Sequence, residues 1–316
     1  MLIRNFIFWL STKKSVTSRI ARRGMQYGFA RRFVAGETLA EALAASQQLA
    51  REDGRRVSLN HLGENVHTEA EARRACESYL EMTRQLEAAG LDGNISIKLT
   101  QLGLDIRPSF CLELTREIAA AARALGRTIE IDMEGSAYTE ATLEIFEQTR
   151  RDHDNVGLAV QAYLYRTERD LERLRPLRPK LRLVKGAYRE PKTVAFQKKG
   201  DMDANYRRLL DKLLDGGLFP AIATHDPAML DYARAQLQAR GFTPDRYEFQ
   251  MIYGVRRDLQ AELRRQNHPL RIYVPFGTDW CPYFMRRLSE RPANCWFVLR
   301  NLLAESLRGR NTTRPS

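Results

Sequence analysis

Residues 128–163, TIEIDMEGSAYTEATLEIFEQTRRDHDNVGLAVQAY, show the pattern that decides the fold. The first run, TIEIDME, is rich in β-branched residues, as is typical of a short strand. Leucine, isoleucine and phenylalanine then recur at helical spacing over 139–151, and VGLAVQAY forms a second apolar run. Strand, helix and strand in this order predict two parallel strands joined by a crossover helix.

The same unit recurs along the chain. Helical patterns lie between the strands, for example at 69–89, 109–125 and 228–240. Eight alternations predict a closed (βα)8 barrel of the TIM type. An open doubly wound sheet is the alternative, but no GxGxxG motif follows any strand. We expect an N-terminal helical segment at 1–50 and the barrel at 51–316. The predicted strands are 57–64, 95–100, 128–134, 156–163, 181–188, 219–225, 247–254 and 270–277.

Composition narrows the class of protein. The 316 residues are 43% hydrophobic and 28% charged, which excludes general disorder. The net charge of +12 is compatible with nucleic acid, an anionic membrane surface or acidic small molecules, and selects none of them. Four cysteines lie far apart without a CxxC motif. This spacing disfavours a zinc site or a disulfide framework and predicts a reducing, cytoplasmic location.

The N-terminus allows two interpretations. Residues 1–10, MLIRNFIFWL, are apolar and are followed by basic residues. The run is too short to cross a bilayer, and its charge order is not that of a signal peptide. A basic, aromatic helix of this kind suits peripheral contact with an anionic membrane, whereas the alternative is a helix packed on the barrel.

Polar side chains gather where the predicted strands end. In a barrel of this class the carboxyl ends of the strands form the active site, and unpaired charge there is costly. So many polar groups at one rim therefore predict a site for a polar ligand, although any one of them can be an ordinary paired rim residue. The group comprises Asn60, Glu64, Lys98, Asp132, Glu134, Gln161, Arg182, Lys185, Thr224, His225, Gln250 and Tyr273.

Two adjacent arginines, Arg286 and Arg287, follow the last predicted strand, and Glu290 stands four residues after the first. One interpretation is a surface helix with an ion pair. The other is a bidentate clamp for a carboxylate, with Tyr273 and Tyr283 lining the same pocket.

Metal and nucleophile chemistry find little support. The five histidines have no ligand spacing, and the sequence contains no HExxH, GxSxG or P-loop motif. His225 alone lies at a strand end, where a hydrogen-bonded contact is the expected role. Redox chemistry in such a pocket would need an organic cofactor.

Several blocks in the expected order resemble the proline dehydrogenase family, and in particular its short monofunctional bacterial form, over roughly residues 30–305. The blocks are ISIKLTQLGLD (95–105), IDME (131–134), VQAYLYRTERDL (160–171), LRLVKGAYREPK (181–192), IATHDP (222–227), EFQMIYGV (248–255), YVPFGTDW (273–280) and YFMRRLSERPAN (283–294). The related domain of the bifunctional proline-utilisation protein is a more distant likeness.

The resemblance implies a distorted (βα)8 barrel with non-covalent FAD. It implies hydride transfer from L-proline to the flavin, which yields Δ1-pyrroline-5-carboxylate, and reoxidation of the flavin by a membrane quinone. This is the first step of proline degradation to glutamate, so a separate pyrroline-5-carboxylate dehydrogenase is the expected metabolic partner. No nucleic-acid partner is expected.

The resemblance also implies roles for single residues. Arg286, Arg287 and Lys98 would grip the substrate carboxylate, Asp132 would position Lys98, and Arg182 would lie beside the flavin N5. Glu290 would support the arginine pair, and the walls around the substrate ring would be Tyr273, Tyr283 and Ile252. The remaining cofactor contacts would be Met133, Gln161, Lys185, Gly186, Ala187, Thr224 and His225. Ile252 and Met133 depart from the family pattern, which more often has leucine and alanine there.

Two other functions remain open at this stage. A flavin barrel of the folate reductase kind would take hydride from a nicotinamide. A basic nucleic-acid-binding protein would suit the net charge, but the arginines are spread along the chain without an aromatic and basic module. Since no strong base is evident, we expect deprotonation of the substrate amine to set the alkaline limb of the pH profile.

Overall fold

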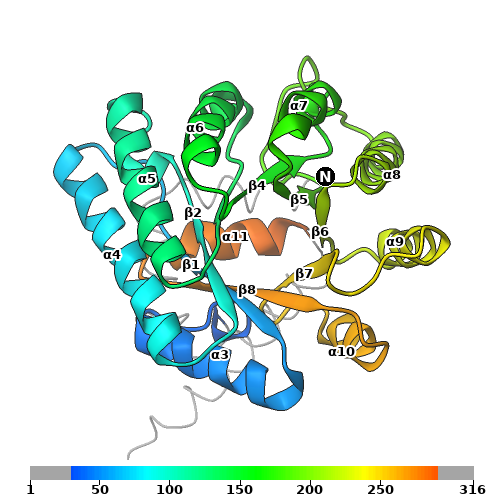
Figure 1. Ribbon diagram of the computed structural model, residues 1–316, viewed down its shortest axis with the longest axis horizontal. Helices are drawn as coiled ribbons and strands as arrows, with labels where there is room; N and C mark the ends of the chain where they lie inside the picture. Colours follow the sequence, from blue (N-terminus) through cyan, green and yellow to red (C-terminus); the bar gives the residue numbers. More distant parts are fainter. Residues whose placement is uncertain (1–29, 291–316) are drawn as a thin grey trace, which may run out of the picture.

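The fold is a closed barrel of eight parallel strands (Figure 1). The computed structural model describes residues 30–290, and for 286–290 it describes the backbone only. β8 pairs with β1 in parallel and closes the ring. The strands are β1 (Arg56–His61), β2 (Gly93–Ile97), β3 (Ile129–Ile131), β4 (Val156–Gln161), β5 (Lys180–Val184), β6 (Phe219–Ala223), β7 (Glu248–Ile252) and β8 (Leu270–Phe276).

Helices surround this ring, and local sequence explains where several of them begin. Thr38 and Glu41 form a capping box at the start of α3, and Thr68 and Glu71 form another at α4. A proline opens α5 and α9, where its missing N–H costs nothing. The helices are α3 (Leu39–Asp53), α4 (Glu69–Ala88), α5 (Pro108–Ala124), α6 (Thr139–Asp152), α7 (Thr167–Leu174), α8 (Lys199–Asp215), α9 (Pro227–Ala239), α10 (Arg257–Arg265) and α11 (Trp280–Glu290).

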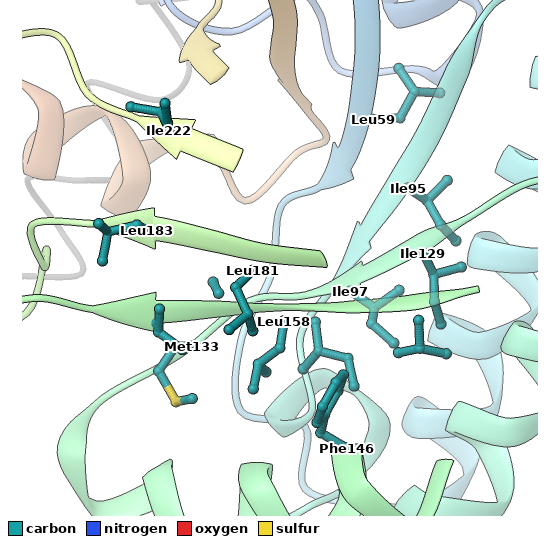
Figure 2. Packing of buried hydrophobic residues seen from close by; sticks show 14 of the residues in the cluster. Leu59, Ile95, Ile97, Ile129, Met133, Phe146, Leu158, Leu181, Leu183 and Ile222 are labelled. Carbon is teal, nitrogen blue, oxygen red and sulfur yellow. The ribbon is translucent and has the colours of Figure 1, made fainter. Parts of the chain in front are cut away.

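The apolar core lies between the strands and the surrounding helices. Side chains such as Ile95, Ile129 and Leu158 point from the strands toward that layer, and Phe146 of α6 belongs to the same cluster (Figure 2). Burial of these side chains stabilises the fold by about 1.5–3 kcal/mol each. The alternate residues of the same strands point into the barrel, and they are largely polar.

A second apolar cluster covers the carboxyl end of the barrel. Trp280 and Phe284 of α11 pack against Phe33, and the cluster includes Leu62 directly after β1. The Trp280 indole donates to Glu37 at 3.1 Å. In Figure 1, α11 crosses the middle of the ring. Residues 30–37 and α11 therefore form one layer above the strand ends.

The predicted (βα)8 fold is confirmed, with all eight strands in their predicted places. Several strands were predicted to extend too far at their carboxyl ends. The strand expected at 181–188 ends at Val184, and the strand expected at 128–134 ends at Ile131. Of the predicted N-terminal helical segment, residues 1–29 lie outside the described part and α3 occupies 39–53. None of the described helices is both long and apolar enough to cross a membrane.

Candidate active site

Asp132 is the centre of the site. It directly follows β3, and its backbone N–H donates to the carbonyl of Ile97 on β2 at 2.9 Å. Its carboxylate receives Arg182 on one oxygen at 2.5 Å, and Tyr273 at 2.7 Å and Lys98 at 3.4 Å on the other. Burial raises the pKa of Asp132, while Lys98 and the Tyr273 hydroxyl oppose the increase. Three donors from three other strands or strand ends thus meet at the carboxylate of Asp132.

Lys98 is held from two directions. Its ammonium donates to the Asn60 side-chain oxygen at 3.3 Å and to Asp132 at 3.4 Å. Its backbone N–H donates to the hydroxyl of buried Tyr79, which itself donates to Gln101 at 2.5 Å. Since an ammonium has three hydrogens, these contacts leave one for a ligand.

Glu134 fixes the loop that follows Lys98. It is buried, and its two carboxylate oxygens accept from the backbone N–H of Thr100 at 3.1 Å and from its hydroxyl at 2.6 Å. Burial raises the pKa of Glu134. The predicted rim residue Glu134 therefore supports the backbone around Lys98, and the described contacts give it no direct link to Asp132.

Arg182 reaches the site from inside the barrel. Besides Asp132 it donates to Gln250 at 2.5 Å and Ser96 at 2.8 Å, and it contacts Glu130. Its guanidinium lies 5.4 Å from the centre of the Tyr273 ring. Burial lowers the pKa of Arg182 to about 10, so it stays protonated near neutral pH.

Tyr273 completes the group from β8. Burial, and secondarily the neighbouring carboxylate of Asp132, raise the pKa of its hydroxyl well above 10, so the hydroxyl remains a donor. Tyr283 on α11 lies near enough to contribute to that increase, and it shares the second apolar cluster with Ile252. The structure thus places the three predicted wall residues around one end of the barrel.

The predicted cofactor residues lie on the neighbouring strand ends of β3 to β6. Gln161 is 2% exposed, and its amide nitrogen donates to the carbonyl of Met133 at 3.2 Å. Its side-chain oxygen has no hydrogen-bond partner among the described residues. A buried acceptor without a donor fits a ligand with an N–H group, such as a flavin ring.

Thr224 and His225 make local contacts at the end of β6. The Thr224 hydroxyl accepts from the N–H of Asp226 at 3.2 Å. His225 Nε2 accepts from the backbone N–H of Ile252 at 2.9 Å, so that nitrogen carries no proton. This contact ties β6 to the end of β7.

Lys185 begins the loop after β5 and is bound by two carboxylates. Its ammonium lies 2.5 Å from Asp203 and 2.7 Å from Asp226, and Lys199 contacts the same two carboxylates. The next residue, Gly186, has a φ of +120°. An added Cβ there would lie within 2.6 Å of three carbons of the Tyr163 ring. Gly186 is therefore required by its backbone conformation and by the close approach of the Tyr163 ring.

Arg286, Arg287 and Glu290 lie on α11, whose backbone crosses the carboxyl end of the barrel. Their side chains lie outside the described residues. The predicted carboxylate clamp therefore stays a prediction.

Sequence reasoning missed a set of charged residues inside the barrel. Glu130 and Glu248 are each 1% exposed, and Lys180 bridges them at 2.7 and 2.6 Å. Arg271 binds Glu248 at 3.0 Å. The signal was present, because charged or amide residues alternate with apolar ones in EIDME (130–134), KLRL (180–183) and EFQM (248–251). Gln250 was predicted at the rim, but it lies within this interior layer.

Known proteins resemble this chain over most of its length. The family model "Proline dehydrogenase" matches residues 42–300. Proline dehydrogenase 1 of Bacillus subtilis subsp. natto is 37% identical over 302 residues, which cover 96% of this chain and 99% of the relative. Proline dehydrogenase of Deinococcus radiodurans is 38% identical and covers 96% and 98%.

Solved structures give the same fold. Proline utilization A from Bdellovibrio bacteriovorus aligns with a TM-score of 0.77 at 24% identity, over 83% of this chain. The alignment covers 32% of that longer protein, so this chain spans about a third of its length. The similarity supports the barrel, while the two full-length relatives carry the family assignment.

Proposed function

The chain belongs to the proline dehydrogenase family, and on that premise we propose that it binds FAD and oxidises L-proline to Δ1-pyrroline-5-carboxylate. The proposed reaction would remove a hydride, which is one proton with two electrons and would be accepted by FAD, and a second proton, which the amine would release to solvent. One observation carries the proposal: Lys98, Arg182 and Tyr273 all donate to the carboxylate of Asp132 at the carboxyl end of the barrel.

FAD would supply the hydride acceptor that protein side chains lack. The residues fit it because the side-chain oxygen of buried Gln161 has no hydrogen-bond partner among the described residues. Gln161, Met133, Thr224 and His225 would line the ring. Lys185, Gly186 and Ala187 would face the pyrophosphate.

Substrate binding would rest on a carboxylate clamp. Lys98 is fixed by Asn60 and Asp132 with one N–H left to donate, and Arg286 and Arg287 would add two guanidiniums. Tyr273, Tyr283 and Ile252 would enclose the apolar part of the ring, and Glu290 would hold the arginines. Such a pocket orients the substrate and excludes water.

The substrate amine has to lose its proton before or during hydride departure. His225 Nε2 already accepts from Ile252, and Asp132 is shared by two cations and a hydroxyl, so neither is free to act as a base. We therefore expect activity to rise with pH as the substrate deprotonates. Retention of this limb in His225→Ala, with FAD bound, supports the proposal; its loss would assign the base to His225.

Reoxidation would be carried out by a quinone, which resides in the bilayer. The apolar, aromatic run at 1–10, together with the basic residues that follow it, would bring the chain to an anionic membrane surface. Deletion of 1–14 should then lower binding to anionic liposomes while activity with a soluble dye persists. Unchanged binding would assign the segment to packing.

The decisive experiment is the visible spectrum of the purified protein before and after anaerobic addition of L-proline. We expect a yellow protein that bleaches with L-proline and not with NADH. Bleaching by NADH alone would favour a reductase of the folate type. A colourless protein that cannot take up FAD would refute the proposal, as would unchanged L-proline affinity after joint neutral replacement of Arg286 and Arg287.

A further inference from the structure

The interior of the barrel contains a continuous chain of buried charges. Arg271 binds Glu248 at 3.0 Å, and Lys180 bridges Glu248 and Glu130 at 2.6 and 2.7 Å. Glu130 then contacts Arg182, whose other face reaches Asp132. Opposite charges thus alternate from the amino-terminal end of the strands to the candidate active site.

Packing of the barrel interior does not by itself explain this series of buried charges. Interiors of such barrels are usually filled by valine, isoleucine and leucine. Replacing buried ion pairs by packed apolar groups is often neutral or stabilising, so stability alone does not call for them. The retained charges meet at Arg182, the one member that touches both the interior chain and Asp132.

The contacts of Arg182 show how its orientation is set. Ser96 and Gln250 accept from it as neutral groups, at 2.8 and 2.5 Å. Among the described contacts, Arg182 has two carboxylate partners, Asp132 at the carboxyl end of the barrel and Glu130 in its interior. Gln250 also donates to Glu130 at 3.1 Å and to Glu248 at 2.6 Å, so the acceptor beside Arg182 is itself held by both carboxylates. Glu130 therefore fixes the guanidinium and offsets part of its charge.

We propose that Glu130, held by Lys180 and Gln250, is a positioning residue that aims Arg182 at the flavin and sets the positive charge that the flavin experiences. The inference rests on the proposed function, which puts the flavin beside Arg182. Glu130 itself is separated from the site by the arginine and touches neither substrate nor cofactor. Its effect on the reaction passes through the reduction potential of FAD.

The sign of the effect follows from charge. Reduction adds negative charge to the flavin, and a nearby carboxylate opposes it. Glu130→Gln keeps the size and hydrogen-bonding ability of the side chain but removes the negative charge. For a charge separation taken as about 10 Å and an effective dielectric constant of about 20, Coulomb's law gives a change on the order of tenfold in the preference for reduced over oxidised FAD. For a two-electron couple that is a rise of about 30 mV.

The test is the midpoint potential of bound FAD, measured by spectroelectrochemistry on the full chain. Glu130→Gln should raise it. Lys180→Met removes a positive charge from the same pair at the open end of the barrel, where the side chain is 17% exposed, and should lower it. Glu248→Gln is the matched control: it is the same substitution at an equally buried carboxylate, but among the described contacts Glu248 reaches Arg182 only through Gln250 and through space, so the shift should be smaller than that of Glu130→Gln.

A merely structural role predicts lower melting temperatures for all three variants and an unmoved potential. An unchanged or lower potential in Glu130→Gln, at wild-type FAD content, would overturn the inference. If Glu130→Gln does not retain FAD, the Lys180→Met variant tests the inference instead. An unchanged or higher midpoint potential of FAD in Lys180→Met would then overturn the inference. A wild-type protein that binds no FAD, or that L-proline does not bleach, would refute the proposed function instead.

Discussion

Gly186→Ala, in the loop after β5, should lower the free energy of unfolding for two reasons, backbone strain and overpacking against Tyr163. The φ of Gly186 is +120°, a conformation that an alanine adopts at a cost of about 1–3 kcal/mol. The new methyl group would also lie within 2.6 Å of three ring carbons of Tyr163, which is buried. Overpacking of this kind costs about 1–3 kcal/mol. We expect a total loss of about 2–6 kcal/mol in the free energy of unfolding, from a typical total of about 5–15 kcal/mol.

Two other glycines provide controls for the same substitution. Gly217 has a φ of +65° with open space around it, so Gly217→Ala measures the backbone cost alone, about 1–2 kcal/mol. Gly200 lies in α8 without a positive φ or a close neighbour, and Gly200→Ala should be neutral or stabilising by up to about 1 kcal/mol.

Urea unfolding of the three variants, with FAD content measured on the same samples, tests the prediction. Gly186→Ala should lose the most stability and be alone in losing FAD, because its loop would face the pyrophosphate. If Gly186→Ala loses no more free energy of unfolding than Gly217→Ala, the Tyr163 ring moves aside without a measurable cost. Full FAD content would remove Gly186 from the cofactor site.

Three further predictions concern the rim. Gly254→Ala would place a methyl group on the carbonyl oxygen of Arg32, so it should displace residues 30–37 and lower the melting temperature, as calorimetry would show. Burial alone would raise the pKa of Asp226, but its contacts with two lysines outweigh burial and lower the pKa to about 2. The ionised carboxylate therefore stabilises the fold by at most about 2 kcal/mol above pH 4, and this stabilisation is lost as the pH falls to 2. Asp226→Asn should remove this pH dependence from acid unfolding curves. Lys98→Met should reduce kcat/KM for L-proline by about 10- to 100-fold, mostly through KM, because it removes a charged donor of about 1.5–3 kcal/mol; unchanged steady-state kinetics would exclude Lys98 from the clamp.

The sequence was sufficient to predict the barrel, because outward apolar residues repeat with the period of a strand and helices separate the runs. The strand ends were less predictable. The run at 181–188 looks continuous, yet the strand ends at Val184, and after one more backbone hydrogen bond, from Tyr163 N–H to the Lys185 carbonyl, Gly186 turns the chain with a positive φ. At 128–134 the last residues, Asp132 and Glu134, use their side chains for contacts beyond the strand. Extended polar residues after a strand resemble the strand itself.

The rim of the site was also predictable, since strand ends converge wherever a parallel barrel closes. Lys98, Asp132 and Tyr273 were expected there, and the structure joins them at one carboxylate. Which charge pairs with which was not predictable. The contact of Glu130 with Arg182 links residues 52 positions apart, on β3 and β5, and depends on the register of the strands between them.

The two faces of each strand explain why function and stability are separable in this fold. Ile129 and Ile131 leave β3 toward the helices, whereas Glu130 between them and Asp132 after them turn to the barrel interior. The outward residues bury apolar area and carry the fold, while the inward residues carry charge that a fold of this kind does not need. Since strand register is fixed by closure of β8 on β1, the two sets cannot exchange places without opening the barrel. An inward charge can therefore be tuned by substitution while the apolar shell keeps its packing, and this separation allows the interior chain to adjust the chemistry at Arg182.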